Sequence, residues 1–159
     1  MITIPLVRGY RPGSVFAYRD GRAVSIEEFL RDAGELAATL PERRHLLNTC
    51  ADRYRFAVGF AAALLRRQVS LLPPNLTPDL IERLVAQYPD LYCLSDGRTG
   101  PELLETVVFP PPAGGVPAAS LIPVIPESQA AVVVFTSGST GDPVPYRKTW
   151  GSLVRSALA

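Results

Sequence analysis

The first regular pattern of apolar and polar positions lies near the amino terminus. Residues 15–24 alternate around a central Asp-Gly pair, which predicts a β-hairpin with a tight turn. Ser25 follows, with Glu28 three residues later, and this spacing predicts a reciprocally capped helix start. The helix is expected to end before Pro41. Its apolar side chains recur at helical spacing: Ile26, Phe29, Leu30, Ala33, Leu36, Ala37 and Leu40.

Strand-like and helix-like patterns then alternate along the chain. Asp52 is a candidate helix cap, Pro78 suits a first helical position, and Gly59 would let its helix approach a sheet closely. Strands alternating with helices imply right-handed crossovers. The predicted fold class is therefore α/β, with a mainly parallel sheet flanked by helices. The predicted order is a strand at 46–47, a helix at 53–67, a strand at 69–72, a helix from 78 to 88, and strands at 91–94 and 106–109.

The segment 110–126 contains six prolines, which disfavour both a helix and a central strand. We expect an extended connector there, without a function of its own. Near the carboxyl end, the apolar spacing from Ser152 onward predicts the start of another helix.

A glycine- and hydroxyl-rich loop follows the most apolar run of the chain. The run, residues 130–135, predicts a buried strand, and open α/β sheets bind ligands at the carboxyl ends of their strands. Glycines allow the backbone to approach an anion, while hydroxyls and backbone N–H groups donate hydrogen bonds to phosphate oxygens. We predict a phosphate-binding loop at 136–143, with these candidate nucleotide-binding residues: Thr136, Ser137, Gly138, Ser139, Thr140 and Gly141.

This loop has two alternative interpretations besides a phosphate site. Flexible linkers are also rich in serine and glycine, but they do not usually follow a strongly apolar strand and precede a Pro-x-Pro-Tyr segment. An ordinary P-loop would have lysine after its last glycine, whereas Asp142 follows Gly141 here. Both alternatives are therefore disfavoured.

Composition narrows the functional classes. The chain has 159 residues, enough for one domain with a substantial core, and 47% of them are hydrophobic. A formal net charge of +1 gives no sign of a nucleic-acid or membrane-surface protein. The start of the chain lacks the pattern of a signal peptide, so we expect a cytoplasmic protein.

Few side chains are candidates for metal or catalytic chemistry. Cys50 and Cys93 lie at or near apolar strands and are expected to be buried, reduced thiols. His45 is the single histidine and is interpreted as a residue at a strand entrance. The sequence therefore gives no metal ligand set, and no convincing general base or nucleophile.

The segment TSGSTGDPVPYRKTWGSL, residues 136–153, resembles the phosphate-binding signature of the adenylate-forming (AMP-binding) superfamily, which includes acyl-CoA synthetases and other acyl ligases. Its first six positions and the proline match the family pattern without a gap. Residues 45–90 are also similar to the family's early strand–helix pattern. The resemblance implies a partial amino-terminal domain over residues 1–159, because the family's enzymes are several times longer.

The resemblance also implies an activity for the full-length parent. A carboxylic acid would be activated with ATP and Mg²⁺ to an acyl-adenylate, and the acyl group would pass to coenzyme A or an acyl carrier protein. The isolated fragment is expected to be inactive. One position departs from the family: Val144 stands where a lysine helps to hold the phosphates, and Arg147 or Lys148 could supply the missing positive charge, although neither occupies the family position. A non-catalytic nucleotide- or partner-binding domain is the alternative.

Overall fold

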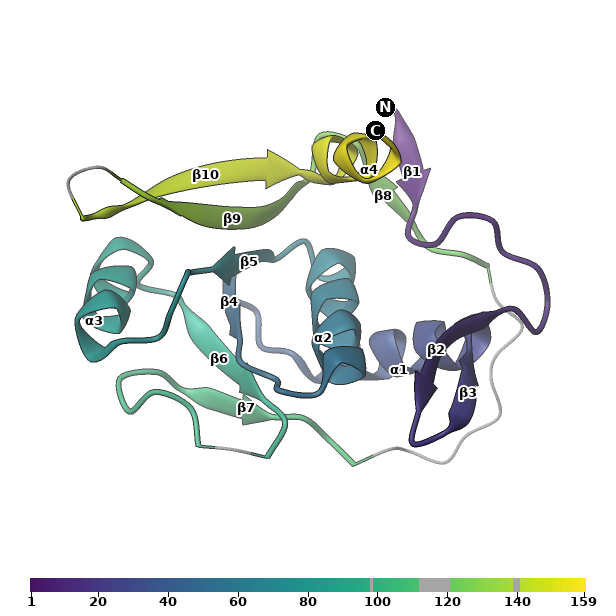
Figure 1. The fold of residues 1–159 in the computed structure, drawn as a ribbon, viewed down its shortest axis with the longest axis horizontal. Helices are drawn as coiled ribbons and strands as arrows, with labels where there is room; N and C mark the ends of the chain where they lie inside the picture. The colour runs from purple at the N-terminus through teal and green to yellow at the C-terminus, as the bar shows by residue number, and fades with distance from the viewer. Residues whose placement is uncertain (98, 112–120, 139–140) are drawn as a thin grey trace.

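A computed structural model describes residues 1–97, 99–111, 121–138 and 141–159 (Figure 1). Within them the main sheet has six strands in the order β10-β9-β5-β4-β6-β7, and every neighbouring pair is parallel except β10 with β9. The predicted α/β fold with a mainly parallel sheet is confirmed. The strands are β4 (His45–Asn48), β5 (Val69–Leu72), β6 (Tyr92–Ser95), β7 (Thr106–Val108), β9 (Ala130–Ser137) and β10 (Pro143–Thr149).

Helices cover both faces of this sheet. Successive residues of a strand point to opposite faces, and their packing partners identify the helices on each side. Leu46 of β4 packs with residues of α1 (Ile26–Thr39) and α2 (Arg53–Leu65), whereas Leu47 packs with residues of α3 (Pro78–Gln87). The helices α1 and α2 therefore lie on one face and α3 on the other.

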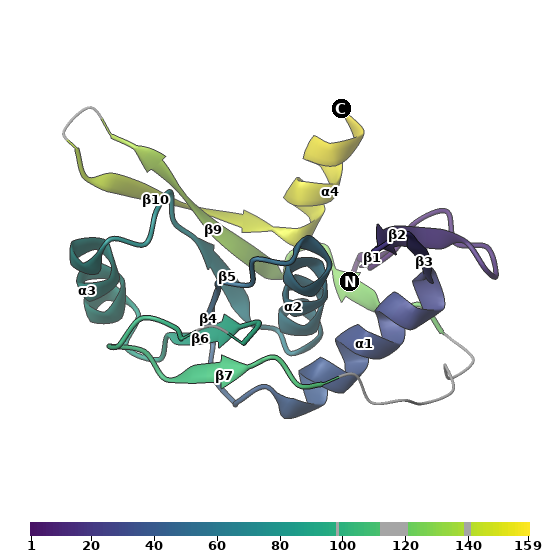
Figure 2. The same ribbon diagram turned by 60° about the horizontal axis from the view of Figure 1, so that its bottom comes forward.

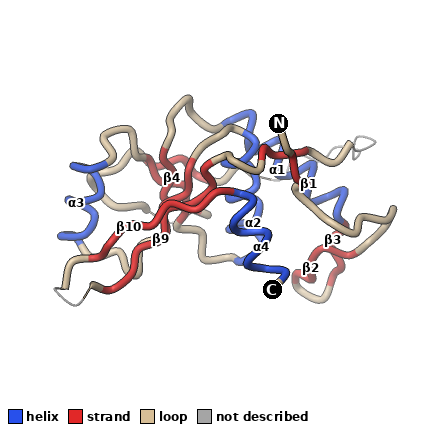
Figure 3. The backbone as a smooth tube through the Cα atoms, turned by 90° about the horizontal axis from the view of Figure 1, so that it is seen from above, coloured by secondary structure: helices blue, strands red, loops and turns tan. Residues whose placement is uncertain are grey.

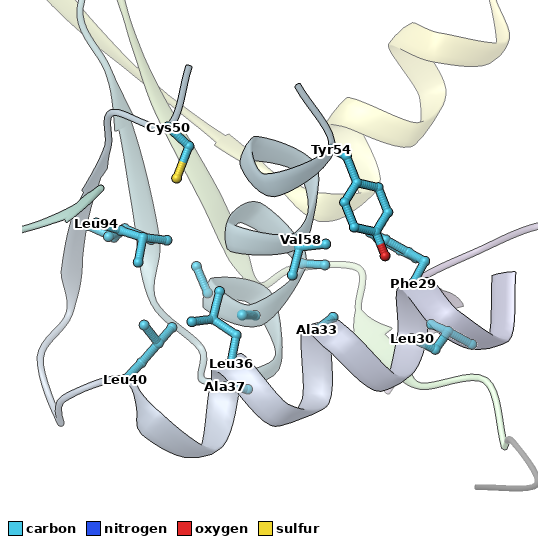
Figure 4. Packing of buried hydrophobic residues seen from close by; sticks show 14 of the residues in the cluster. Phe29, Leu30, Ala33, Leu36, Ala37, Leu40, Cys50, Tyr54, Val58 and Leu94 are labelled. Atoms are coloured by element: carbon cyan, nitrogen blue, oxygen red, sulfur yellow. The ribbon is translucent and has the colours of Figure 1, made fainter. Parts of the chain in front are cut away.

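The predicted caps position two of these helices. Ser25 Oγ accepts a hydrogen bond from the Glu28 N–H at 3.1 Å, and the Glu28 carboxylate accepts one from the Ser25 N–H at 3.0 Å. Asp52 Oδ1 accepts the Arg55 N–H at 2.8 Å. Because both starts are fixed, the apolar stripe of α1 meets α2 and the sheet in one cluster (Figure 4).

The predicted hairpin closes one end of this cluster. It consists of β2 (Val15–Arg19) and β3 (Arg22–Ser25), with Asp20 and Gly21 at positive φ in the turn. The ring of Phe16 stacks on that of Phe29 of α1 at a centroid distance of 3.8 Å. Figure 3 shows this hairpin at the end of the molecule opposite α3.

Three segments differ from the sequence prediction. The proline-rich segment is not a connector throughout, because Val124–Pro126 forms β8 and pairs with β1 (Thr3–Pro5); its residues 112–120 lie outside the described residues. The segment from Pro143 is a strand, so β9 and β10 form an antiparallel hairpin. The last helix, α4 (Trp150–Leu158), begins two residues earlier than predicted, and the Thr149 side chain caps it.

A buried polar chain links the sheet to the end of α1. The Tyr92 hydroxyl donates to Gln68 Oε1 at 2.7 Å, and Gln68 Nε2 donates to the Pro41 carbonyl at 2.7 Å. Tyr92 is 0% exposed and Gln68 is 2% exposed. The buried Tyr92 hydroxyl and Gln68 side chain therefore each rely on this chain for a hydrogen-bond partner.

We expect Tyr92→Phe to lower the free energy of unfolding by about 1–3 kcal/mol, because it leaves Gln68 Oε1 buried without its donor. Urea unfolding followed by circular dichroism measures this change. The control is Tyr18→Phe, which removes a hydroxyl from a side chain that is 73% exposed and should change stability by less than about 0.5 kcal/mol. Equal effects of the two substitutions would contradict the importance of the buried chain.

None of the helices in the described part of the chain combines the length and the apolar character that a membrane-spanning helix needs.

Candidate functional site

The predicted phosphate-binding residues lie at the tip of the β9–β10 hairpin. The hairpin projects past the carboxyl end of β5, whose last paired residue is Leu72, opposite Val134. Figures 1 and 2 both show this tip at the same end of the molecule as α3. The structure therefore places the loop beyond the carboxyl ends of parallel strands, where open α/β sheets bind ligands.

A tight turn closes the hairpin. The Gly141 N–H donates to the Gly138 carbonyl at 3.1 Å, and Gly141 has a φ of +84°, a conformation that glycine adopts without strain. Thr136 and Ser137 are exposed and Gly138 is half-buried. Ser139 and Thr140, which complete the predicted set, lie outside the described residues. The glycine at 141 is thus required by the turn itself, before any ligand is considered.

The two prolines of β10 determine which amides of the tip are available. Pro143 pairs with Ser137 and Pro145 pairs with Phe135. Proline has no N–H, so these two pairs cannot exchange hydrogen bonds, and the pair between them, Thr136 with Val144, must do so. The Thr136 N–H is therefore used in the ladder, which differs from the open loop that the sequence predicts.

Because hydrogen-bonded and non-hydrogen-bonded pairs alternate along the hairpin, the backbone N–H of Ser137 has the opposite direction to that of Thr136. The Ser137 N–H points away from β10, toward the side of β5, and lies three residues beyond the last β5–β9 pair. Ser137 also shares a sheet face with Val133 and Phe135, which pack in the cluster formed by α3. Its hydroxyl and its amide are the described donors of the tip that are best placed for an anion.

A charged residue of α3 contacts the tip directly. Arg83 Nη1 forms an ion pair with the Asp142 carboxylate, and both side chains are exposed. The cations that follow in the sequence do not lie near the loop, since Arg147 pairs with Val133 and Lys148 with Val132. At about 3.4 Å per residue, Arg147 lies roughly 14 Å along the strand from Pro143. The expectation that Arg147 or Lys148 could supply the missing charge is therefore not supported.

Comparison with known proteins gives relatives at the level of structure alone. No protein-family model matches the sequence, and no curated protein matches it. Among solved structures, the chain is similar to the N-terminal subdomain of Klebsiella oxytoca NpsA in complex with 3-hydroxybenzoyl-AMSN, with a TM-score of 0.65 and 18% identity. It is also similar to o-succinylbenzoate CoA synthetase (MenE) of Bacillus subtilis in complex with the acyl-adenylate OSB-AMP, with a TM-score of 0.69 and 16% identity.

The chain has the fold of the N-terminal subdomain of adenylate-forming enzymes. The similarity covers 87% of this chain in both comparisons, but only 37% of the NpsA chain and 40% of the MenE chain. A third structure, Escherichia coli MenE with a bound analogue of OSB-AMS, has a TM-score of 0.70 and 16% identity and covers 93% of this chain and 33% of its own. The chain thus spans less than half the length of these proteins.

The described residues do not include a ready-made cluster of metal ligands. Among them, no group of three or more His, Cys, Asp or Glu side chains could hold a metal ion. Asp142 is the carboxylate within the predicted loop 136–143, and it is paired with Arg83. Mg²⁺ with a nucleotide needs only one or two protein carboxylates together with the phosphates, and of the described carboxylates Asp142 is the one at the tip.

Other polar groups at this edge of the sheet join its loops to one another. Asp96, which follows β6, accepts hydrogen bonds from the N–H groups of Asp52 and Ala51 at 2.9 Å each. These bonds, of which the one from Asp52 has the larger effect, hold the pKa of the Asp96 carboxyl below its usual range.

Burial raises the pKa of Cys50 to about 12 and also raises that of Cys93. Both cysteines are buried free thiols, as predicted, and neither is an activated nucleophile.

His45 is structural. It is the first residue of β4, and its Nδ1 lies 2.6 Å from Asp90 Oδ1, while Asp90 Oδ2 accepts the Arg44 N–H at 2.7 Å. The interpretation of His45 as a residue at a strand entrance is confirmed.

Two features of the site were missed by sequence reasoning. One is the ion pair between Arg83 and Asp142, which are 59 positions apart and have no local signal. The other is a cavity of about 590 Å³ beside the start of α3, at the carboxyl edge of the sheet. None of the described residues of the loop 136–143 lines it. The cavity is lined by Thr49, Leu76, Pro78, Ile81, Glu82, Thr99, Gly100, Pro101, Glu102 and Leu103.

Proposed function

We propose that the tip of the β9–β10 hairpin binds the phosphate chain of ATP. The observation that carries the proposal is the position of a glycine- and hydroxyl-rich turn at the carboxyl edge of a parallel sheet, with Ser137 aimed past the end of β5. The likeness to NpsA and MenE, whose structures contain acyl-adenylate ligands or analogues, supports the same proposal.

The chain would act as part of an acid–thiol ligase that forms AMP. In that reaction a carboxylate attacks the α-phosphate of ATP, an acyl-adenylate forms and pyrophosphate leaves. The acyl group then passes to the thiol of coenzyme A or of an acyl carrier protein. One of the similar structures, MenE bound with its product analogue OSB-NCoA, supports coenzyme A as the acceptor.

The role proposed for this chain is phosphate positioning rather than proton transfer. Negative charge develops on the pyrophosphate as it leaves, and fixed donors aimed at that charge lower the barrier. The Ser137 amide and hydroxyl are such donors, and the Gly141–Gly138 hydrogen bond fixes the turn that carries them. Ser139 and Thr140 belong to the same proposed set of phosphate-binding residues through their place in the sequence.

Amide chemical shifts of the isotopically labelled chain test the proposal. ATP at millimolar concentration should shift the amide signals of residues 136–142 and leave those of α1 unchanged. The control ligand is adenosine, which lacks phosphates and should shift none of the loop signals. Absence of loop shifts with ATP would overturn the assignment.

A non-catalytic nucleotide- or partner-binding domain is the second candidate. Val144 favours it, because the residue at this exposed position of β10 has neither charge nor side-chain donor. Adenylate formation by a longer protein containing this chain, measured as acid-dependent exchange of pyrophosphate into ATP, would separate the two candidates. Exchange supports the ligase, and nucleotide binding without exchange supports the second candidate.

A further inference from the structure

The proposed phosphate site needs positive charge, and its own hairpin does not place any at the tip. Val144 is uncharged, while Arg147 and Lys148 lie four and five positions along β10 from Pro143. Neutral donors alone bind a polyphosphate more weakly than charged ones, because charge-assisted hydrogen bonds are roughly twice as strong. The charge must therefore come from another element.

We propose that Arg83 of α3 contacts the bound phosphate chain, and that Asp142 holds Arg83 beside the loop when no nucleotide is bound. The inference rests on the proposed function, and it adds a residue that the sequence pattern does not contain. Arg83 Nη1 already reaches the tip through Asp142, from an element 59 positions earlier in the chain.

The position of α3 fixes where Arg83 stands. Leu80, Ile81 and Leu84 are buried against the sheet, so the backbone of this helix is held by its packing. Arg83 points out of that interface, with 60% of its side chain exposed. In Figures 1 and 2, α3 lies next to the hairpin tip in both views, which agrees with the ion pair.

Arg83 and Ser137 approach the tip from the same side. Ser137 shares its sheet face with Val133 and Phe135, which pack in the α3 cluster. An anion held by the Ser137 hydroxyl therefore lies on the face from which Arg83 extends. Thr136 and Val144 belong to the opposite face.

The ion pair is one that a phosphate can replace. Both partners are exposed, at 60% for Arg83 and 74% for Asp142, and exposed pairs contribute little to stability. A polyphosphate carries several negative charges and accepts two parallel hydrogen bonds from one guanidinium. Exchanging the Asp142 carboxylate for phosphate oxygens is consequently favourable, and Asp142 competes with the ligand for Arg83.

The test is calorimetric titration of the intact chain with inorganic pyrophosphate and, separately, with ATP. We expect Arg83→Gln to weaken pyrophosphate binding about tenfold or more, because it removes a charged hydrogen bond. Asp142→Asn should strengthen binding, since it removes both a competitor and a negative charge. The double variant should bind as weakly as Arg83→Gln. Arg83→Lys should lie between, because lysine keeps the charge but not the planar fork.

The matched control is Arg155→Gln. Arg155 is an arginine in a comparable exposed ion pair, with Glu127, and its side chain is 65% exposed. Its removal changes the net charge by the same amount, so it should leave pyrophosphate affinity within about twofold of the parent. A loss equal to that of Arg83→Gln would show a general charge effect and would overturn the proposal.

The outcomes separate this inference from the proposed function. If ATP binds and Arg83→Gln binds it equally well, the phosphate site stands and the role of Arg83 is overturned. If pyrophosphate binding depends on Arg83 but ATP does not bind, the role of Arg83 stands and the nucleotide proposal falls. If the parent chain binds neither ligand, both are overturned.

Discussion

We expect Gly59→Ala to lower the free energy of unfolding by about 2–4 kcal/mol. A Cβ at this position of α2 would lie 2.6 Å from Asn48 Nδ2 and 2.7 Å from Leu94 Cδ2. Leu94, on β6, is 0% exposed and cannot move into solvent. Asn48 donates to the Phe56 carbonyl at 3.0 Å and accepts the Cys50 N–H at 3.2 Å, so displacing it breaks buried hydrogen bonds.

Urea unfolding of the variant and of Gly34→Ala measures this effect against a matched control. Gly34 is also inside a helix, α1, but a Cβ there meets nothing within 4 Å. Alanine should therefore stabilise that helix by up to about 1 kcal/mol through its higher helix propensity. If both alanine variants are stabilised alike, α2 does not pack against the sheet as closely as the structure shows.

The elements predicted correctly are those with local signals. The capping box of Ser25 with Glu28, the cap at Asp52 and the proline at the first position of α3 each act within one helical turn. Gly59 was expected to allow close approach, and the structure shows its contacts with Asn48 and Leu94. Neighbouring residues settle such features, so the sequence is sufficient for them.

The elements that were missed depend on partners far away in the chain. The strand β1 pairs with β8, more than a hundred positions later, and proline occurs in both. The strand β10 contains Pro143 and Pro145, which argue against a strand when they are considered alone. At an edge strand, however, alternate residues can lack an N–H without breaking the ladder, and β10 is the first strand in the sheet order.

For the candidate site, the contiguous glycine and hydroxyl pattern indicates residues 136–141, and their role in phosphate binding stays a prediction. The use of the Thr136 amide in the ladder could not be predicted without β10. The Arg83–Asp142 pair could not be predicted either, because it needs the packing of α3 beside the hairpin.

We expect Val144→Lys to increase the affinity for pyrophosphate about tenfold or more. Val144 is 42% exposed and pairs with Thr136, next to the tip, so a lysine there extends into solvent without displacing core residues. Its side chain starts on the face opposite Ser137, but β10 is an edge strand, and the flexible four-carbon stem of lysine lets the ammonium reach around that edge to the anion. A hydrogen bond from a charged donor contributes about 1.5–3 kcal/mol, which corresponds to that gain. Calorimetric titration at two salt concentrations measures it, and the gain should fall as salt rises.

Tyr146→Lys is the matched control for this substitution. Tyr146 lies on the same face of β10, pairs with Val134 and is 52% exposed, but it is two residues farther from the turn. At about 3.4 Å per residue, its ammonium starts roughly 7 Å farther from a phosphate at the tip, where salt screens much of the attraction. A gain of less than about threefold is therefore expected. Equal gains from both lysines would mean that the anion is attracted by net charge alone, and no gain from Val144→Lys would mean that the anion lies out of reach of the edge of β10.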